Sequence, residues 1–172
     1  MQTAMTPSLL ALLLIVAFVL HDGEETLMMQ HWQQRHSADI MRRFPRLKRR
    51  LSHLTSITTR GFAIAAAEEF VIIAAAAIML FLGVPYAFYI VSALFIAFVV
   101  HQAIHLVQAL ILRSYVPGLL TNILLLPATI TGLVYIIQSL TATQIAVCSA
   151  AGIVVMVINL PFAHYIGRKL SQ

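Results

Sequence analysis

The sequence has few charged residues: only 10% of its 172 residues are Asp, Glu, Lys or Arg, whereas 60% are hydrophobic. A soluble domain carries roughly a quarter charged residues, so this composition excludes an ordinary soluble domain. The alternation in segments of about ten residues that marks a transmembrane β-barrel is also lacking, because the apolar runs are continuous. Runs of about 20 apolar residues are long enough to cross a bilayer as helices. We therefore expect one all-α transmembrane domain that covers residues 1–172.

Cysteine and the common catalytic signatures are also scarce. The chain contains one cysteine, Cys148, so no intrachain disulfide can form. It contains no CxxC pair, no phosphate-binding loop, no GxxxG and no Ser-His-Asp set. The N-terminus lacks a basic region, and the first apolar run ends in acids rather than in a small-residue cleavage site. A retained membrane helix is therefore expected at the N-terminus, rather than a removed signal peptide.

Five apolar segments are present, and glycine, proline or polar residues separate them. They are residues 6–28, 61–84, 86–112, 116–139 and 143–167. Residues 30–60, between the first two, are too polar and basic to span a membrane. They are predicted to form basic amphipathic helices on the membrane surface, broken at Pro45. The sequence therefore predicts a five-span transmembrane helix bundle.

The positions of the basic residues predict the orientation of this bundle. Eight of the eleven lie between Arg35 and Arg60, and the others are Arg113, Arg168 and Lys169. The positive-inside rule puts the 30–60 loop in the cytoplasm, and the N-out/C-in topology that follows places all eleven cations on the cytoplasmic side. We expect a multi-pass protein of the cytoplasmic (inner) membrane. Its basic segment, residues 35–60, should bind anionic lipid headgroups rather than nucleic acid.

Most of the few acids lie inside predicted spans. Of six acids in the chain, five do so: Asp22, Glu24, Glu25, Glu68 and Glu69. An ionisable residue inside a membrane costs roughly 3 kcal/mol on insertion scales, so it normally faces the bundle interior and has a partner. At a rise of about 1.5 Å per residue, these acids share one depth with the histidines of the third and fifth spans. A polar functional cavity is therefore predicted in the cytoplasmic leaflet.

The types and spacing of these residues predict a metal site. His21 and Glu25 are four residues apart, as are His101 and His105, so each pair shares a helix face. Imidazole and carboxylate are ligands of zinc and of non-haem iron or manganese, and we predict a divalent metal, with zinc favoured. The predicted ligands are His21, Glu25, Glu69, His101, His105 and His164, the predicted catalytic acids are Glu68 and Glu24, and the predicted supporting residues are Gln108, Asn122 and Asn159. Asp22 and His36 are expected outside the site.

Five motifs resemble those of bacterial HXXEE-domain membrane proteins. They are "LHDGEETLMMQHW", with His21, Glu24 and Glu25, then "AAAEEF", "HQAIHLVQ", "RSYVPGLLTN" and "NLPFAHYIGR". The resemblance covers essentially the whole chain and supports the site residues, but the family has no assigned activity. A looser likeness is to the CAAX-type (ABI) intramembrane metalloproteases, which pair a Glu-Glu motif with histidines on following helices. The arginine expected after the glutamate pair is missing here, and Asn159 precedes His164 instead of following it.

Three functions fit these observations. The first is a metal-dependent membrane enzyme, expected to be a hydrolase, that acts on a lipid-like or membrane-partitioned substrate. The second is a small carrier for protons, metal ions or a cationic solute that uses the same carboxylates. The third is a non-catalytic protein that binds lipid or protein partners through its basic loop. Single residues also have simpler explanations, such as Glu24 reaching the interface or Glu68 pairing with Arg60.

Overall fold

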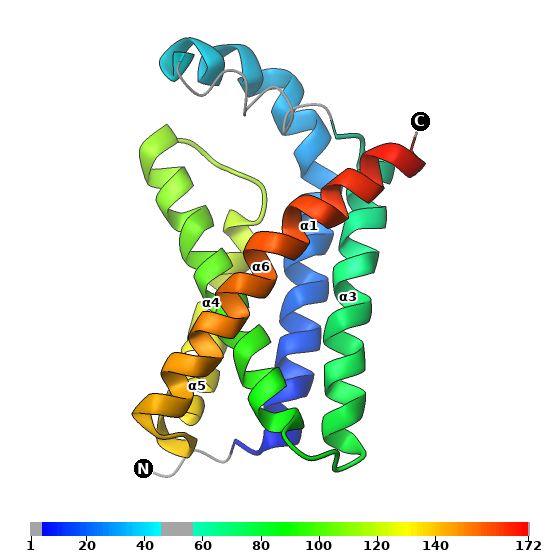
Figure 1. The fold of residues 1–172 in the computed structure, drawn as a ribbon. Helices are drawn as coiled ribbons and strands as arrows, with labels where there is room; N and C mark the ends of the chain where they lie inside the picture. Colours follow the sequence, from blue (N-terminus) through cyan, green and yellow to red (C-terminus); the bar gives the residue numbers. More distant parts are fainter. Residues whose placement is uncertain (1–4, 46–56, 172) are drawn as a thin grey trace.

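The computed structural model describes residues 5–45 and 57–171, and in these ranges the chain forms helices and no strand. Five long helices follow one another: α1 (Pro7–Arg43), α3 (Thr59–Phe81), α4 (Ala87–Leu112), α5 (Leu119–Ser139) and α6 (Ala142–Leu170) (Figure 1). Each is long and apolar enough to cross a membrane. The prediction of an all-α bundle with five spans is thus confirmed, whereas the N-out/C-in orientation stays a prediction.

Helix α1 extends well beyond the first predicted span. No glycine or proline interrupts residues 24–44, so the first part of the predicted surface segment is the end of α1 rather than a separate helix. This end leans over the loop between α4 and α5 (Figure 1). There the Trp32 indole donates a hydrogen bond to the Tyr115 carbonyl (2.7 Å), and Arg43 donates to the Leu112 carbonyl (3.1 Å). The rest of the surface segment, residues 46–56, lies outside the described residues.

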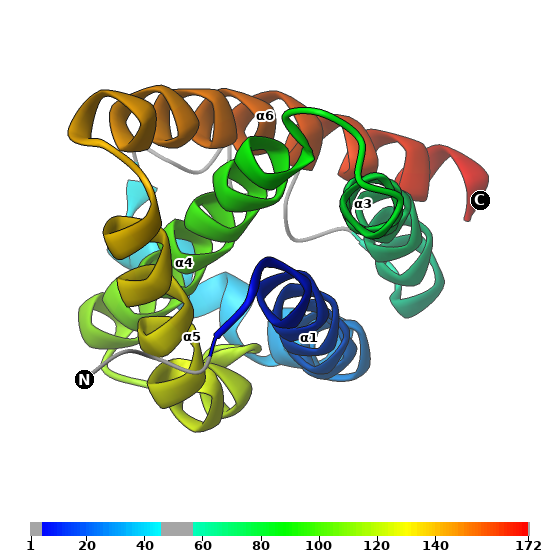
Figure 2. The same cartoon turned by 90° about the horizontal axis from the view of Figure 1, so that it is seen from below.

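Small residues allow α6 to pack closely on α3 and α4. A Cβ atom added at Gly167 would meet the backbone carbonyl of Gly61 on α3, and one at Gly152 would meet that of Ala93 on α4. Residues without a bulky side chain let the backbones of membrane helices approach one another. As a result, α1, α3, α4 and α6 surround a common centre, while α5 lies beside α1 and α4 (Figure 2).

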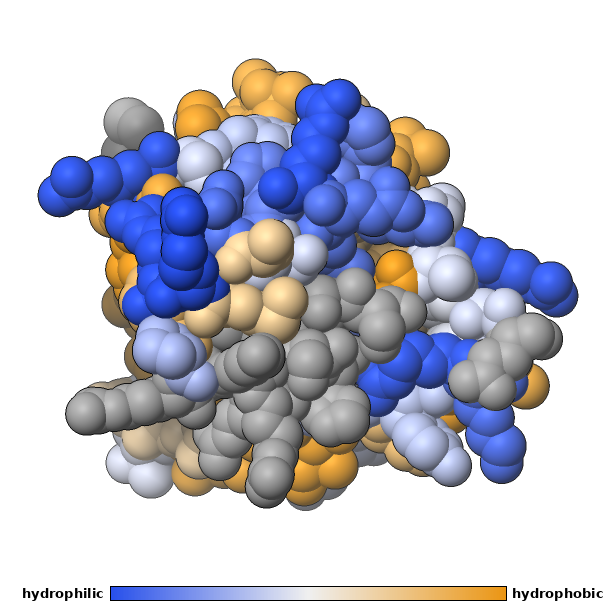
Figure 3. Space-filling model, turned by 90° about the horizontal axis from the view of Figure 1, so that it is seen from above, coloured by the Kyte–Doolittle hydropathy of each residue, from blue (hydrophilic) through white to orange (hydrophobic). Residues whose placement is uncertain are grey.

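Polarity is divided along the length of the bundle. Near the N-terminus of α1 the core is apolar and includes Leu10, Leu14, Phe95 and Ile136. At the opposite end, the last turns of α1 and α6 carry arginine and lysine, and hydrophilic side chains gather on this face (Figure 3). Buried polar residues such as His21, Glu25 and His105 lie between the two. The functional candidates therefore occupy a layer between the apolar core and the basic end.

Candidate metal centre

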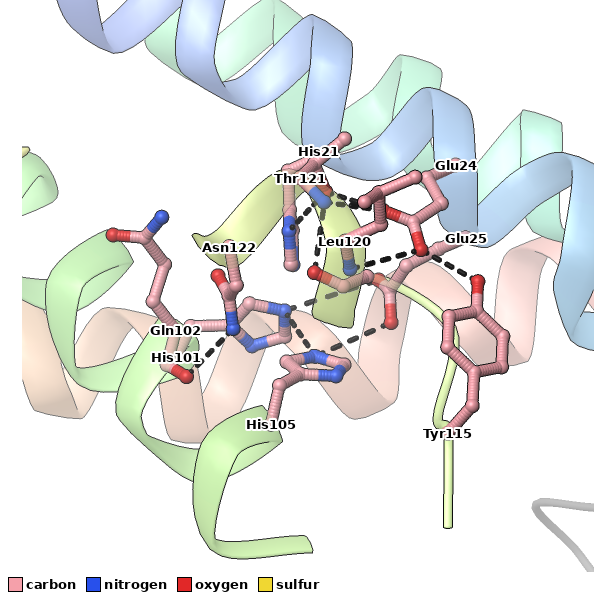
Figure 4. Close-up of polar contacts among 11 residues, drawn as sticks. His21, Glu24, Glu25, His101, Gln102, His105, Tyr115, Leu120, Thr121 and Asn122 are labelled. Carbon is pink, nitrogen blue, oxygen red and sulfur yellow. Dashed lines mark hydrogen bonds and ion pairs between the residues drawn. The ribbon is translucent and has the colours of Figure 1, made fainter. Parts of the chain in front are cut away.

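Four potential metal ligands from α1 and α4 meet in the interior of the bundle. They are His21, Glu25, His101 and His105, and one ligand atom from each lies within 4.8 Å of all the others (Figure 4). His21 and Glu25 are buried, as is His105, and His101 is partly buried. Both pairs have the i, i+4 spacing that places side chains on one helix face. The packing of α1 against α4 brings the two faces together.

The distances within this cluster are short. Nε2 of His105 lies 3.0 Å from Nε2 of His101. The two oxygens of Glu25 lie on these same nitrogens, with Oε1 3.2 Å from His105 Nε2 and Oε2 3.8 Å from His101 Nε2. Three imidazoles and one carboxylate are a donor set that suits zinc. The residues present therefore fit a divalent ion by donor chemistry and by proximity.

His21 completes the set through its contact with α5. Its Nδ1 lies 3.3 Å from the hydroxyl oxygen of Thr121, and that hydroxyl donates its shortest hydrogen bond, 2.6 Å, to the carboxylate of Glu24. Because the Thr121 hydroxyl donates its proton to the hydrogen bond with Glu24, its oxygen is left to accept a hydrogen bond from His21 Nδ1–H. The other nitrogen of His21, Nε2, is buried and has no hydrogen-bond partner among the described residues. This tautomer leaves the Nε2 lone pair free for a ligand.

Glu24 lies outside the cluster, at the N-terminus of α5. Its carboxylate accepts hydrogen bonds from the backbone N–H groups of Leu120 (3.3 Å) and Thr121 (2.7 Å), and from the hydroxyls of Tyr115 (2.5 Å) and Thr121. A negative charge at this position offsets the positive end of the helix dipole and satisfies free N–H groups. Partial burial and the bond to Glu24 raise the pKa of Tyr115, so its hydroxyl stays a donor. Glu24, which the sequence suggested as a catalytic acid, therefore holds α5 against α1.

Gly118 shapes the wall behind His21. Its backbone has a φ of +84°, which residues with side chains rarely adopt. A Cβ atom here would lie 2.6 Å from Cε1 of the His21 ring and 3.3 Å from Cγ of Glu25. Gly118 thus allows the α4–α5 loop to close directly over two of the four candidate ligands.

A pocket of about 80 Å³ adjoins the cluster and shares His101 with it. Four helices line it, namely α1, α3, α4 and α6, and its polar lining consists of Asp22, Glu69, His101 and Asn159. Its other lining residues are apolar, apart from the thioether of Met156. The buried Asp22, which was expected outside the metal site, is not among the four grouped ligands but lines this adjoining pocket. Its position three residues before Glu25, on the same turn as His21, was the signal that could have identified it.

The two glutamates of α3 have different positions. Glu69 lines the pocket together with Asp22 and His101. Glu68 instead accepts a hydrogen bond of 3.0 Å from the side-chain amide of Asn159 on α6. Of the two, Glu69 is therefore the one that faces the candidate site, and Glu68, the expected catalytic acid, ties α3 to α6.

The other predicted site residues are not among the four grouped ligands. His164 packs edge-on against Phe62, with ring centres 5.3 Å apart, and is not among the grouped ligands. Asn122 donates a hydrogen bond of 2.8 Å to the backbone carbonyl of Gln102 and so joins α5 to α4 behind the cluster. Gln108 is exposed near the end of α4, where this helix stands apart from α3 and α6 (Figure 1). Sequence reasoning also missed Thr121 and Tyr115, which contact α1 only through the fold.

Comparison with known proteins adds one finding. A family model described as "Protein of unknown function with HXXEE motif" matches residues 12–132. The matched region contains all four grouped ligands and the loop that carries Gly118, whereas α6 lies outside it. No curated protein and no solved structure matches the chain.

Proposed function

Because the chain belongs to the HXXEE family, whose function is unknown, we propose from its own geometry that it is a membrane-embedded, metal-dependent enzyme. The reaction class that we propose is hydrolysis of a membrane-partitioned substrate. The three defining residues of the motif then have distinct roles. His21 and Glu25 are ligands, and Glu24 orients His21 through Thr121 while it anchors α5.

The observation that carries this proposal is the convergence of four donor atoms within 4.8 Å beside an apolar pocket. A buried carboxylate beside three imidazoles, with no Lys or Arg as partner, is costly to keep in an apolar interior. Among the described residues, no Lys or Arg forms an ion pair with Glu25. A divalent ion is the single partner that satisfies all four groups, and zinc is the ion that this donor set favours.

The neighbouring residues supply what a hydrolytic site needs. A divalent ion held by these ligands would act as a Lewis acid. Glu69 lines the pocket together with His101 and would accept a proton from water there. The apolar lining excludes bulk water and strengthens electrostatic interactions inside the site. Glu69, rather than Glu68, is therefore our candidate for the general base.

A cation carrier is the second candidate, and one observation favours it. Asp22 and Glu69 line one pocket of a membrane bundle, Glu25 belongs to the adjoining cluster, and no Lys or Arg lines the pocket in the described part of the chain. A carrier would bind its cargo there reversibly, whereas an enzyme would retain its ion during purification.

Metal content and thermal stability test the enzyme proposal. We expect the purified protein to hold one divalent ion per chain and to melt at a lower temperature after chelation, since binding to the folded state stabilises it. His105→Ala should remove both the ion and the effect of the chelator. His164→Ala is the matched control, because it removes a half-buried histidine outside the group, and it should retain both. A wild-type protein without metal, melting identically with and without chelator, would overturn the proposal, and cation flux in proteoliposomes would then support the carrier.

A further inference from the structure

The pocket beside the cluster has an apolar end and a polar end, and the same order holds on four helices. On α1 the lining runs from Phe18 to Asp22, and on α4 from Leu94 to His101. On α3 and α6 the polar members are Glu69 and Asn159. In each case the polar residue lies closer to the basic end of the bundle than most of its apolar neighbours. On α3, which runs antiparallel to the other three helices, the polar residue therefore comes first in the sequence. The pocket is therefore amphipathic along the bundle axis.

The apolar part of the pocket has the length and surroundings of a site for a hydrocarbon chain. From Leu94 to His101 the wall of α4 extends about 10 Å, at about 1.5 Å per residue. Val155 on α6 lines this part and is also 40% exposed. In a membrane that exposed surface faces lipid, so the pocket is accessible from the hydrocarbon region. An amphiphile could enter from the bilayer with its polar head towards the basic end.

The polar end carries two carboxyl groups and no basic side chain among the described residues. The Asp22 side chain is buried, with an exposed fraction of 8%. No hydrogen bond to it is found among the described residues. Glu69 faces the same space, and no Lys or Arg lines it in the described part of the chain. A buried carboxylate without a partner is costly. Two carboxyl groups with no basic side chain beside them would be matched by a cationic group.

We infer that this pocket binds a single-chain amphiphile with a cationic head, such as a primary amine, with its head at Asp22 and Glu69 and its chain along α4 and α6. The conclusion that this amphiphile is the substrate rests on the proposed function. Binding of the amphiphile to the pocket needs no metal. An anionic head would meet two carboxyl groups with no basic side chain beside them. The polar end therefore discriminates by charge, and the apolar wall selects for a chain.

Photolabelling of the full-length protein in nanodiscs tests this inference. The probes are a long-chain primary amine with a diazirine in its chain, and the alcohol and carboxylic acid with the same chain. We expect the amine to label peptides of α4 and α6 at the pocket, with apparent affinity about tenfold higher than that of the acid, which corresponds to about 1.4 kcal/mol. The double variant Asp22→Asn, Glu69→Gln should remove this preference, whereas Asp39→Asn, an exposed acid on α1, should not.

A matched pair of tryptophan variants tests the position of the chain. Val155 lines the pocket and its neighbour Val154 does not, although both are exposed on α6. Val155→Trp should reduce labelling at least about tenfold and Val154→Trp should not, with equal melting temperatures as the check on folding. Leu94→Phe provides a second obstruction, from α4, if Val155→Trp does not fold. Equal labelling by amine and acid, or full labelling of both obstructed variants, would overturn the inference and indicate a general lipid groove.

The same labelling distinguishes failure of this inference from failure of the proposed function. Chelated wild-type protein should still bind the amine, since the two carboxyl groups remain. If the protein holds no metal but the amine labels the pocket, the binding inference stands and the enzyme proposal fails. If the protein holds metal but the amine does not label the pocket, the binding inference fails and the enzyme proposal stands.

Discussion

The two adjacent glutamates of the HXXEE motif should respond differently to the same small change. Glu24→Gln and Glu25→Gln each replace one carboxylate oxygen by an amide NH₂ group and remove one charge. Glu25 is one of the four candidate ligands, and only 4% of it is exposed. Glu24 instead accepts four hydrogen bonds at the start of α5. We expect Glu25→Gln to abolish metal binding, and Glu24→Gln to destabilise the bundle while the ion is retained.

The magnitude for Glu24→Gln follows from its hydrogen bonds. Each oxygen of Glu24 accepts one bond from a backbone N–H and one from a hydroxyl. An NH₂ group on either side loses the backbone bond, and the hydroxyl must turn to accept instead of donate. Hydrogen bonds to charged groups contribute about 1.5–3 kcal/mol each, and water compensates part of this loss because Glu24 is only partly buried. We expect the free energy of unfolding to fall by about 2–3 kcal/mol, or roughly 5–10 °C in melting temperature. Because Glu24 also orients Thr121 and thereby His21, the metal affinity should fall about tenfold.

The magnitude for Glu25→Gln comes from ligand linkage instead. At a free-ion concentration 100 times the dissociation constant, a bound ion stabilises the fold by about 2.7 kcal/mol. Glu25→Gln should lose this contribution and show no further change on chelation. Glu24→Gln should melt below wild type both with and without chelator, and should still respond to the chelator.

Elemental analysis gives the metal content, and fluorescence of the single tryptophan gives the melting curve. Trp32 is suited to this, because its indole is bonded to the Tyr115 carbonyl in the loop before α5. If Glu24→Gln loses its ion at saturating metal while Glu25→Gln retains one, or if Glu24→Gln melts like wild type, our assignment of the two glutamates is wrong.

Three further predictions concern the backbone and the membrane orientation. Gly118→Ala should lower metal affinity at least about tenfold, because its Cβ would meet the His21 ring. Gly83 has a similar positive φ but nothing within 4 Å of an added Cβ, so Gly83→Ala should leave metal binding unchanged. Titration of both variants with zinc measures the difference. Gly152→Ala should destabilise the bundle by about 1–3 kcal/mol, since the added Cβ pushes α6 away from α4. Gly23→Ala, in open space on α1, should be neutral or stabilising by up to about 1 kcal/mol. Thermal melting compares the two variants. Single cysteines in the loops before α4 and before α6 should be labelled from outside intact cells, and one at the end of α1 only after lysis; the opposite pattern would reverse the predicted orientation.

The spans and the pairing of ligands on each helix could be predicted from the sequence, because both depend on local order along the chain. The apolar runs correspond to α3, α4, α5 and α6 and to the first part of α1. The spacing of four between His21 and Glu25 places both side chains on one face of any helix, whatever surrounds it. His101 and His105 follow the same rule, and these are the four residues that the structure groups.

What only the tertiary structure decided is which member of each acidic pair faces the interior. Adjacent residues on a helix point about 100° apart, whereas the sequence predicted both members of each pair in the site, Glu25 and Glu69 as ligands and Glu24 and Glu68 as catalytic acids. The rotation of each helix depends on contacts between residues far apart in the chain, such as Gly167 on Gly61 and Gly118 on His21. These contacts turn Glu25 into the cluster and Glu24 onto the start of α5. They also bury Asp22 in a pocket that exists only where four helices meet.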